Sequence, residues 1–311
     1  MKNKSSYITA SVFAIIGLTS CKDEPNNPIE KTMKETIYQA KDFDPSKFEA
    51  KIDSLVSSMT LEEKIGMLHG NSMFATTGVE RLGIPELKMA DGPLGIREEI
   101  SRNSWATAGW DNDFATYYPA AGAVAATWNP ELSYTFGNSV GQEARARGKD
   151  MILSPAINII RTPLGGRTYE YFTEDPFLNK KLAVPFIIGM QDNDVMACVK
   201  HFAVNNQETN RGTVDVQVDE RTLREIYLPA YKAAVTEANA YSLMGAYNKF
   251  RGDYLCENDY MLNKILRDEW GFKGVVVSDW AAVHTTVKTL ENGLDIEMGT
   301  PKPFNEFFLA D

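Results

Sequence analysis

Cysteine and histidine are scarce in this sequence, which has three of each among 311 residues. Cys198 and Cys256 are too few and too far apart to suggest a disulfide framework. Cys198 lies in an apolar run, so we expect it to be a small buried residue. No H-x-H or H-E-x-x-H pattern is present, which argues against a histidine-rich metal site. We therefore expect neither a metal nor another cofactor.

Motifs of several common enzyme classes are also missing. Without G-x-S-x-G the chain has no α/β-hydrolase nucleophile elbow. Without G-x-G-x-x-G after a strand or G-x-x-x-x-G-K-[ST], nucleotide-binding folds lose support. Acidic residues outnumber basic ones by 42 to 32, and the net charge of −10 argues against nucleic acid as a partner. A composition of 43% hydrophobic and 24% charged residues excludes a disordered or collagen-like chain.

The first twenty residues have the pattern of a secretion signal. Two lysines precede an apolar run, Ile8 to Leu18, that is too short to span a bilayer. It ends in Leu18-Thr19-Ser20-Cys21, which resembles a bacterial lipobox whose cysteine becomes lipidated. We predict a lipoprotein signal peptide over 1–20, lipidation of Cys21 and a tether over 21–45. The lipid would anchor the protein to the outer membrane, on the periplasmic or the cell-surface side. The alternative is an ordinary secretory signal.

From residue 46 onward, helix and strand patterns alternate. Thr60-Leu61-Glu62-Glu63 is a capping box, and Asn129-Pro130 is typical of a helix start. Further helices are expected from residues 219, 258 and 283, with a kink at Pro229. Short apolar runs between them indicate strands at residues 87–90, 151–160 in part, 195–199, 241–246, 275–277 and 295–298. The alternation predicts an α/β fold, as a (β/α)8 TIM-type barrel rather than a doubly wound sheet.

Chemically capable residues follow the ends of these runs. Asp91 follows the run at 87–90, and Lys200-His201 follows the run at 195–199. Tyr247 follows the run at 241–246, and Asp279-Trp280 comes just after the run at 275–277. Singly, each could be a turn, a solvated strand end or a helix cap. Together they indicate an active site, because the C-terminal strand ends of a (β/α)8 barrel meet at one rim.

The side chains expected at this rim are typical of a carbohydrate site. Carboxylates and cations form charge-assisted hydrogen bonds with hydroxyls, and aromatic rings stack on pyranose faces. A carboxylate can also attack an anomeric carbon, and we expect a neighbouring cation to lower its pKa. The carboxylates are Asp91 and Asp279, the cations are Arg97, Arg167, Lys200 and Arg211, and the aromatics are Tyr247 and Trp280.

An ordered series of motifs over residues 52–299 resembles glycoside hydrolase family 3, and most closely its β-glucosidase-like members. Any one motif is weak, but their number and order are highly specific. They are Met59-Thr60-Leu61-Glu62-Glu63-Lys64-Ile65-Gly66, Asp91-Gly92-Pro93-Leu94-Gly95-Ile96-Arg97, Gly166-Arg167 followed by Glu174-Asp175-Pro176, Lys200-His201-Phe202, Met244-Gly245-Ala246-Tyr247-Asn248 and Gly274-Val275-Val276-Val277-Ser278-Asp279-Trp280. Residues 46–311 are thereby identified as the N-terminal barrel domain of such an enzyme.

The resemblance implies exo-acting hydrolysis of terminal β-D-glucosyl or xylosyl residues from oligosaccharides or β-glucosides. Asp279 matches the nucleophile, which forms a covalent glycosyl-enzyme with retention. Asp91 matches the carboxylate that binds hydroxyls on the far side of the terminal sugar. The other matching pocket positions are Arg167, Lys200 and His201, and then Arg97, Arg211, Met244, Tyr247 and Trp280.

Retaining hydrolysis also needs an acid/base about 5–5.5 Å from the nucleophile, and nothing in the sequence matches it. In the β-glucosidase branch this group comes from a second α/β domain. We expect that domain to be absent here, the last barrel helix to be incomplete and the acid/base to be missing from this chain. Glu297, at the end of the last run, is a local carboxylate, but the sequence does not favour it as a substitute acid. The alternatives are a glycan-binding surface lipoprotein without turnover and a barrel isomerase or aldolase using Lys200 as a Schiff base. The last requires Lys200 to have a depressed pKa.

Overall fold

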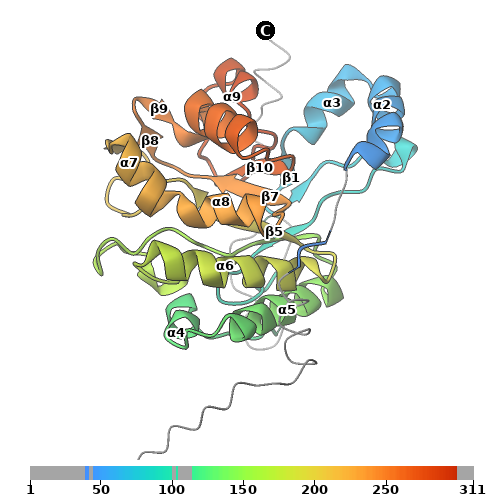
Figure 1. Cartoon of the computed structure of the whole chain (residues 1–311). Coiled ribbons are helices and arrows are strands. Elements are labelled where there is room, and N and C mark those ends of the chain that lie inside the picture. Colours follow the sequence, from blue (N-terminus) through green and yellow to red (C-terminus); the bar gives the residue numbers. More distant parts are fainter. Residues whose placement is uncertain (1–38, 42–44, 100–102, 104–113, 300–311) are drawn as a thin grey trace, which may run out of the picture.

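The computed structural model describes residues 39–41, 45–99, 103 and 114–299 of the chain (Figure 1). The predicted signal peptide, the lipidation site Cys21 and most of the predicted tether lie outside the described residues. The predicted incomplete last helix, which would include residues 300–311, also lies outside them. No helix in the described ranges is long and apolar enough to cross a membrane.

Five parallel strands form the sheet that carries the candidate site. In spatial order they are β10 (Val275–Ser278), β7 (Ser242–Gly245), β5 (Met196–Phe202), β4 (Met151–Leu153) and β3 (Met89–Asp91). Each neighbouring pair runs parallel. The C-terminal ends of the five strands therefore lie at the same edge of the sheet.

Backbone pairing continues beyond this sheet and closes it into a ring. The segment at Ile296 and Glu297 pairs in parallel with β10 on one side and with the residue before β1 (Gly70–Ser72) on the other. β1 pairs with β2 (Ala75–Thr76), which pairs antiparallel with the residue before β3. The predicted α/β fold of TIM-barrel type is confirmed. It departs from regular (β/α)8 geometry because β2 runs antiparallel to both neighbours.

Helices begin where the sequence supplies caps. The Glu63 amide donates to the Thr60 hydroxyl and the Thr60 amide donates to the Glu63 carboxylate, which is the predicted capping box of α3 (Leu61–Met67). Asn129 caps α5 (Pro130–Ala146). The helix predicted from residue 219 is divided rather than merely kinked. Its three parts are α7 (Glu220–Thr222), the π-helical segment η4 (Leu223–Tyr227) and α8 (Pro229–Thr236). Proline starts α8 because a first helical residue needs no N–H donor.

The remaining elements complete the outer layer and the loops. The helices are η1 (Pro45–Phe48), α2 (Glu49–Ser58), η2 (Glu80–Leu82), α4 (Ala121–Ala125), η3 (Thr168–Glu170), α6 (Pro176–Gln191), η5 (Leu255–Glu257), η6 (Tyr260–Glu269) and α9 (Val287–Glu291). A small sheet of β6 (Asp215–Val216), β8 (Lys249–Phe250) and β9 (Asp253–Tyr254) lies outside the ring of strands.

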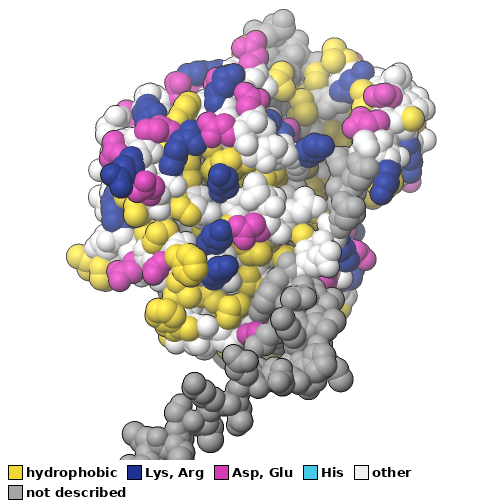
Figure 2. Space-filling model, in the orientation of Figure 1, with side chains coloured by type: hydrophobic (Ala, Val, Ile, Leu, Met, Phe, Trp, Pro, Cys, Tyr) yellow, Lys and Arg dark blue, Asp and Glu magenta, His cyan; other side chains and the backbone are white. Residues whose placement is uncertain are grey.

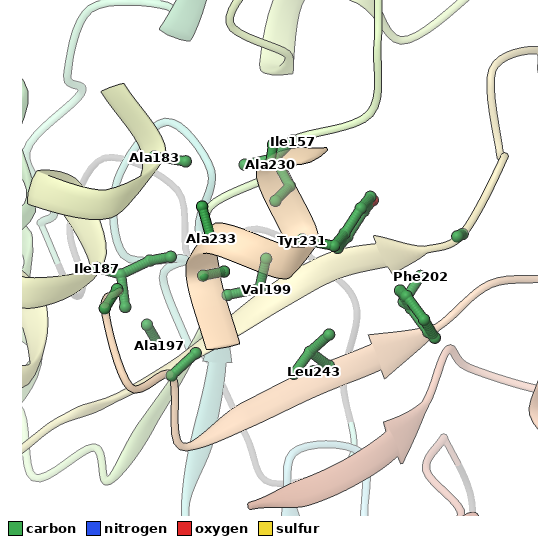
Figure 3. Packing of buried hydrophobic residues seen from close by; sticks show 14 of the residues in the cluster. Ile157, Ala183, Ile187, Ala197, Val199, Phe202, Ala230, Tyr231, Ala233 and Leu243 are labelled. Carbon is green, nitrogen blue, oxygen red and sulfur yellow. The ribbon is translucent and has the colours of Figure 1, made fainter. Parts of the chain in front are cut away.

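Hydrophobic side chains fill both faces of the parallel sheet. The outer cluster packs the strands against helices, and Figure 3 shows Val199 and Leu243 of the sheet close to Ala233 and Tyr231 of α8. The inner cluster is enclosed by the strands and contains Phe74, Met89, Met151, Leu153, Cys198, Met244, Val277 and Met298. Cys198 and Val199 belong to different clusters because successive side chains of a strand point to opposite faces. The burial predicted for Cys198 is confirmed.

Charges of both signs are interspersed on the visible face over α7, α9 and the small sheet (Figure 2). Several are paired there, as where Arg224 contacts both Glu220 and Glu269. Exposed ion pairs contribute at most about 1 kcal/mol each. The two hydrophobic clusters therefore supply most of the stability that holds the rim in place.

Candidate active site

The structure brings the predicted carboxylates and cations together at the rim. Asp91 is the last residue of β3, Lys200 and His201 lie near the end of β5, and Asp279 directly follows β10. Lys200 Nζ lies 2.8 Å from Asp91 Oδ1, and His201 Nε2 lies 3.6 Å from Asp279 Oδ2. The three strand ends thus form one site, with Asp91 and Asp279 on opposite sides of the Lys200-His201 pair.

Asp279 is a buried carboxylate, with 8% of its surface exposed. Its Oδ1 accepts a hydrogen bond of 2.8 Å from the Trp280 amide. Burial raises the pKa of Asp279 above its ordinary value, by more than the positive charges of Lys200 and Arg167 lower it. Lys200 and Arg167 do lower this pKa, as expected of neighbouring cations, but the net shift is upward. The cations are present, but desolvation outweighs them.

His201 faces Asp279 as a neutral imidazole. Burial, together with the positive charges of Arg167 and Lys200, lowers the pKa of His201 well below its ordinary value. Its main chain is fixed by a 2.7 Å hydrogen bond from its amide to Asn158 Oδ1 and a 2.8 Å bond from the Tyr231 hydroxyl to its carbonyl. A neutral ring at 3.6 Å from Asp279 Oδ2 can donate a hydrogen bond to a substrate hydroxyl without adding charge.

Lys200 and Asp91 form an ion pair, with Lys200 buried and Asp91 half-buried. Burial alone would lower the pKa of Lys200, but Asp91 and Glu170 raise it above its ordinary value. Burial would likewise raise the pKa of Asp91, yet Lys200 and Arg167 lower it. Lys200 is therefore a charged hydrogen-bond donor. A Schiff-base lysine needs the opposite shift, so the isomerase or aldolase interpretation loses its basis.

Two glutamates that the sequence analysis missed hold the pocket arginines. Arg167 Nε donates to Glu170, whose side chain is buried, and Arg167 Nη1 lies 3.8 Å from Glu208 Oε1. Glu208 Oε2 also accepts a 2.6 Å hydrogen bond from Arg211. Both Arg167-x-x-Glu170 and Glu208-x-x-Arg211 have a three-residue spacing between opposite charges. That spacing is the signal that could have revealed them.

Arg211 and Tyr247 meet on the other side of this pocket. The Arg211 guanidinium lies over the Tyr247 ring, 4.3 Å from its centroid. Burial and the nearby Asp279 carboxylate raise the pKa of Tyr247, so its hydroxyl stays protonated beside that carboxylate. A chain of alternating charges thus runs from Glu170 to Arg211 and ends on the aromatic ring next to Asp279.

Three predicted pocket residues lie around Phe74, which the sequence analysis also missed. Trp280 packs against Phe74 at 5.4 Å between ring centroids, and its Nε1 donates a 2.8 Å hydrogen bond to the Met73 carbonyl. The Arg97 guanidinium lies 5.3 Å from the centroid of the same phenyl ring. Met244 lies in the inner cluster with Phe74. Phe74 thus connects Trp280, which follows Asp279, with Arg97 through contacts of its ring.

The pKa of Glu297 would suit a proton donor, but Glu297 does not face the inner cluster of the barrel. Burial raises the pKa of Glu297 to about 7. Its chain neighbours Ile296 and Met298 pack in the inner cluster, so alternation places Glu297 on the opposite face of that segment.

The described residues contain no cluster that could hold a metal ion. Among residues 39–41, 45–99, 103 and 114–299, no three or more His, Cys, Asp or Glu side chains come together in such a group.

The chain is similar to known proteins over most of its length. The profile of the glycosyl hydrolase family 3 N-terminal domain matches residues 79–306. Beta-glucosidase BoGH3A of Bacteroides ovatus is 50% identical over 257 residues, which are 83% of this chain and 34% of that protein. An exo-alpha-(1->6)-L-arabinopyranosidase of Bifidobacterium longum is 41% identical over 243 residues, 78% of this chain and 32% of that protein.

The fold is likewise similar to a solved structure, that of beta-glucosidase 3B from Thermotoga neapolitana in complex with glucose. The TM-score is 0.75 at 41% identity, covering 80% of this chain and 36% of the other. The chain spans about a third of the length of the curated relatives it matches. The matched profile includes every predicted pocket residue from Asp91 to Trp280.

Proposed function

The chain belongs to glycoside hydrolase family 3, and we propose that it forms the nucleophile-bearing barrel of a retaining exo-β-glycosidase. The proposed substrates are terminal β-D-glucosyl or xylosyl residues of oligosaccharides and simple β-glucosides. The observation that carries the proposal is the buried Asp279 carboxylate at the rim, beside Lys200, His201 and Arg167. This set combines a nucleophile with hydroxyl-binding groups of both charges.

In the proposed reaction, an Asp279 oxygen attacks the anomeric carbon while the glycosidic oxygen leaves with a proton. Water then attacks the anomeric carbon from the face that the leaving group vacated, opposite Asp279, and gives up a proton as the bond to Asp279 breaks; the two successive inversions retain the configuration. The Trp280 amide holds Oδ1 in place during both steps. Lys200 and Arg167 oppose the effect of burial and favour the ionised carboxylate. Asp91 and Lys200, as adjacent acceptor and donor, suit vicinal hydroxyls of the terminal sugar.

The proposed source of the leaving-group proton lies outside the described rim. The other carboxylates around the pocket, Asp91, Glu170 and Glu208, each accept a hydrogen bond from a cation. A carboxylate committed to a lysine or arginine is poorly suited to donate a proton. The relatives are about three times as long as this chain, so they contain further residues from which such a group could come. We propose that the acid/base belongs to the part of the family's length that this chain does not span.

A fluorinated dinitrophenyl β-glucoside tests the nucleophile without the acid/base, because its leaving group departs unprotonated. We expect one covalent sugar adduct on the peptide that contains Asp279, detected by mass spectrometry. Asp279→Asn should abolish the adduct, while Asp253→Asn, an exposed carboxylate paired with Lys288, should keep it. Labelling of another residue would refute the assignment. Binding of glucose without any labelling would favour the glycan-binding interpretation.

Sugar preference and cellular location are separate parts of the proposal. Relatives are named for β-glucosidase and for arabinopyranosidase activity, so a panel of nitrophenyl β-glucoside, β-xyloside and α-L-arabinopyranoside is the direct measurement. We expect the β-glucoside to give the highest kcat/KM. We further propose lipidation at Cys21 and outer-membrane anchoring. Cys21→Ser should then move the protein from the membrane fraction to the soluble fraction.

A further inference from the structure

His201 is turned toward the pocket against the normal alternation of its strand. Cys198 of β5 packs in the inner cluster and Val199 in the outer one, so alternation would send the side chain at position 201 outward. Yet His201 Nε2 lies 3.6 Å from Asp279 Oδ2 at the rim, and Phe202 packs in the outer cluster instead. The pairing of β5 with β7 is irregular between Val199 and Phe202. His201 therefore reaches the site because the strand is irregular there.

Side chains hold the main chain of His201 at this irregularity. In the described pairing of β5 with β7, Phe202 has a partner residue and His201 has none. Asn158 Oδ1 instead accepts a 2.7 Å hydrogen bond from the His201 amide, and Asn158 Nδ2 donates one of 3.0 Å to the His201 carbonyl. The Tyr231 hydroxyl donates to the same carbonyl at 2.8 Å. Both polar groups of this main chain are thus satisfied by side chains.

Asn158 also touches the imidazole ring. Its Oδ1 lies 3.4 Å from His201 Nδ1, so Asn158 and Asp279 face different nitrogens of the ring. Asn158 and His201 are only 2% and 1% exposed, so solvent does not readily replace these contacts. The segment that carries Asn158 follows β4 and is anchored on β5, because the Ile157 amide donates to the Lys200 carbonyl at 2.8 Å.

We propose that Asn158 and Tyr231 are positioning residues that hold the His201 imidazole where Nε2 contacts a hydroxyl of the bound sugar. The proposal rests on the proposed function and deepens it, because the sugar is the substrate proposed for that site. Among the residues that the structure describes, the Asn158 amide forms its hydrogen bonds with His201 alone, so it acts through His201. Without these supports, the main chain would be free to return to regular alternation, which points the ring away from Asp279.

The first measurement follows the imidazole itself by nuclear magnetic resonance. The chain has three histidines, so the ring signal of His201 in a carbon–proton correlation spectrum is assigned by its loss in His201→Ala. We expect Asn158→Ala to shift and broaden that signal, because the ring loses its fixed position. The signals of His69 and His284 should stay in place and serve as internal controls.

Asn258→Ala is the matched control variant. Asn258 is also buried, and its side chain makes the same pair of main-chain bonds. It accepts from the Met261 amide at 2.9 Å and donates to the Phe250 carbonyl at 2.8 Å. Its removal should therefore cost comparable hydrogen bonds while leaving the His201 signal unchanged.

The second measurement asks whether the sugar senses the position of the ring. Binding of glucose and of its 2-, 3-, 4- and 6-deoxy analogues is followed by calorimetry, which requires no turnover. In the parent protein, loss of the hydroxyl that His201 contacts should weaken binding about fivefold, as for one hydrogen bond. That difference should disappear in His201→Ala, which identifies the hydroxyl, and equally in Asn158→Ala. The double variant should bind glucose no more weakly than His201→Ala, because Asn158 acts only through the ring.

Tyr231→Phe keeps the test decisive if Asn158→Ala does not fold. It removes one oxygen and keeps the ring that packs on Phe202 at 5.3 Å between centroids (Figure 3). It should shift the His201 signal and reduce the fivefold difference.

An unmoved His201 signal in the folded variants, or losses of Asn158 and His201 that add in full, would overturn the proposal. Failure of the proposed function would appear separately, as absent sugar binding and absent labelling of Asp279, and the imidazole signals would still decide the positioning role.

Discussion

The ion pair between Lys200 and Asp91 makes the most specific prediction about the stability of the rim. The two partners are unequally buried, since 4% of the Lys200 side chain and 36% of the Asp91 side chain are exposed. Removing one partner of a buried pair leaves an uncompensated charge and costs about 3–5 kcal/mol. The cost should therefore depend on which partner is removed.

Asp91→Asn leaves the ammonium in a site that water barely reaches, so we expect a loss of about 4 kcal/mol in the free energy of unfolding. Lys200→Met leaves a carboxylate that water can reach, and after allowing for that screening we expect a loss of about 2 kcal/mol. The double variant should lose about 2 kcal/mol less than the sum, because it removes the interaction only once. The asymmetry is the distinctive part of the prediction.

The pH dependence follows from the directions of the two shifts. The folded state lowers the pKa of Asp91, so its contribution is present above its unfolded pKa of about 3.9 and is lost as the pH falls through the folded value. The folded state raises the pKa of Lys200, so its contribution is present below about 10.4 and is lost as the pH rises through the folded value. The cost of each substitution should be constant between about pH 5 and 9.

Urea unfolding followed by circular dichroism measures these differences at several pH values. Glu225→Gln is a suitable control, since Glu225 pairs with Arg221 on the exposed surface. Equal losses for the two single variants, or no coupling in the double variant, would show that the pair does not act through its unequal burial.

Three further predictions concern other parts of the molecule. Glu208→Gln weakens the hold on both pocket arginines, so kcat/KM for an aryl glucoside should fall about tenfold, as for one charge-assisted hydrogen bond; an unchanged value would contradict the bridging role. A methyl group on Gly245 would lie 2.8 Å from the sulfur of Cys256, so Gly245→Ala should cost about 1–3 kcal/mol in thermal unfolding. Adding Cys256→Ala should recover at least half of that loss, and no recovery would mean that the clash is elsewhere. In Cys21→Ser protein, burial should keep Cys198 and Cys256 from reacting with Ellman's reagent until the chain unfolds, and rapid native reaction would contradict their burial.

Most of the fold was predictable because its determinants are local. Caps such as Thr60 and Asn129 start helices wherever the chain has them, and short apolar runs become strands. The reversed β2 and the division of the helix at Pro229 were not predicted. Both depend on which neighbour supplies the next hydrogen bond, and a periodic pattern does not contain that information.

For the candidate site, the sequence determined which residues meet. Asp91, Lys200, His201 and Asp279 lie at or just beyond the C-terminal ends of three parallel strands, and the connectivity of a barrel alone brings such positions to one rim. The tertiary structure decided their charge states and their support. Desolvation depends on every atom around a carboxylate, so only the folded chain shows that burial of Asp279 outweighs the cations beside it. Likewise, Glu208 reaches Arg167, and Lys41 reaches the carbonyl of Asp192, only because packing brings segments that are distant in sequence into contact.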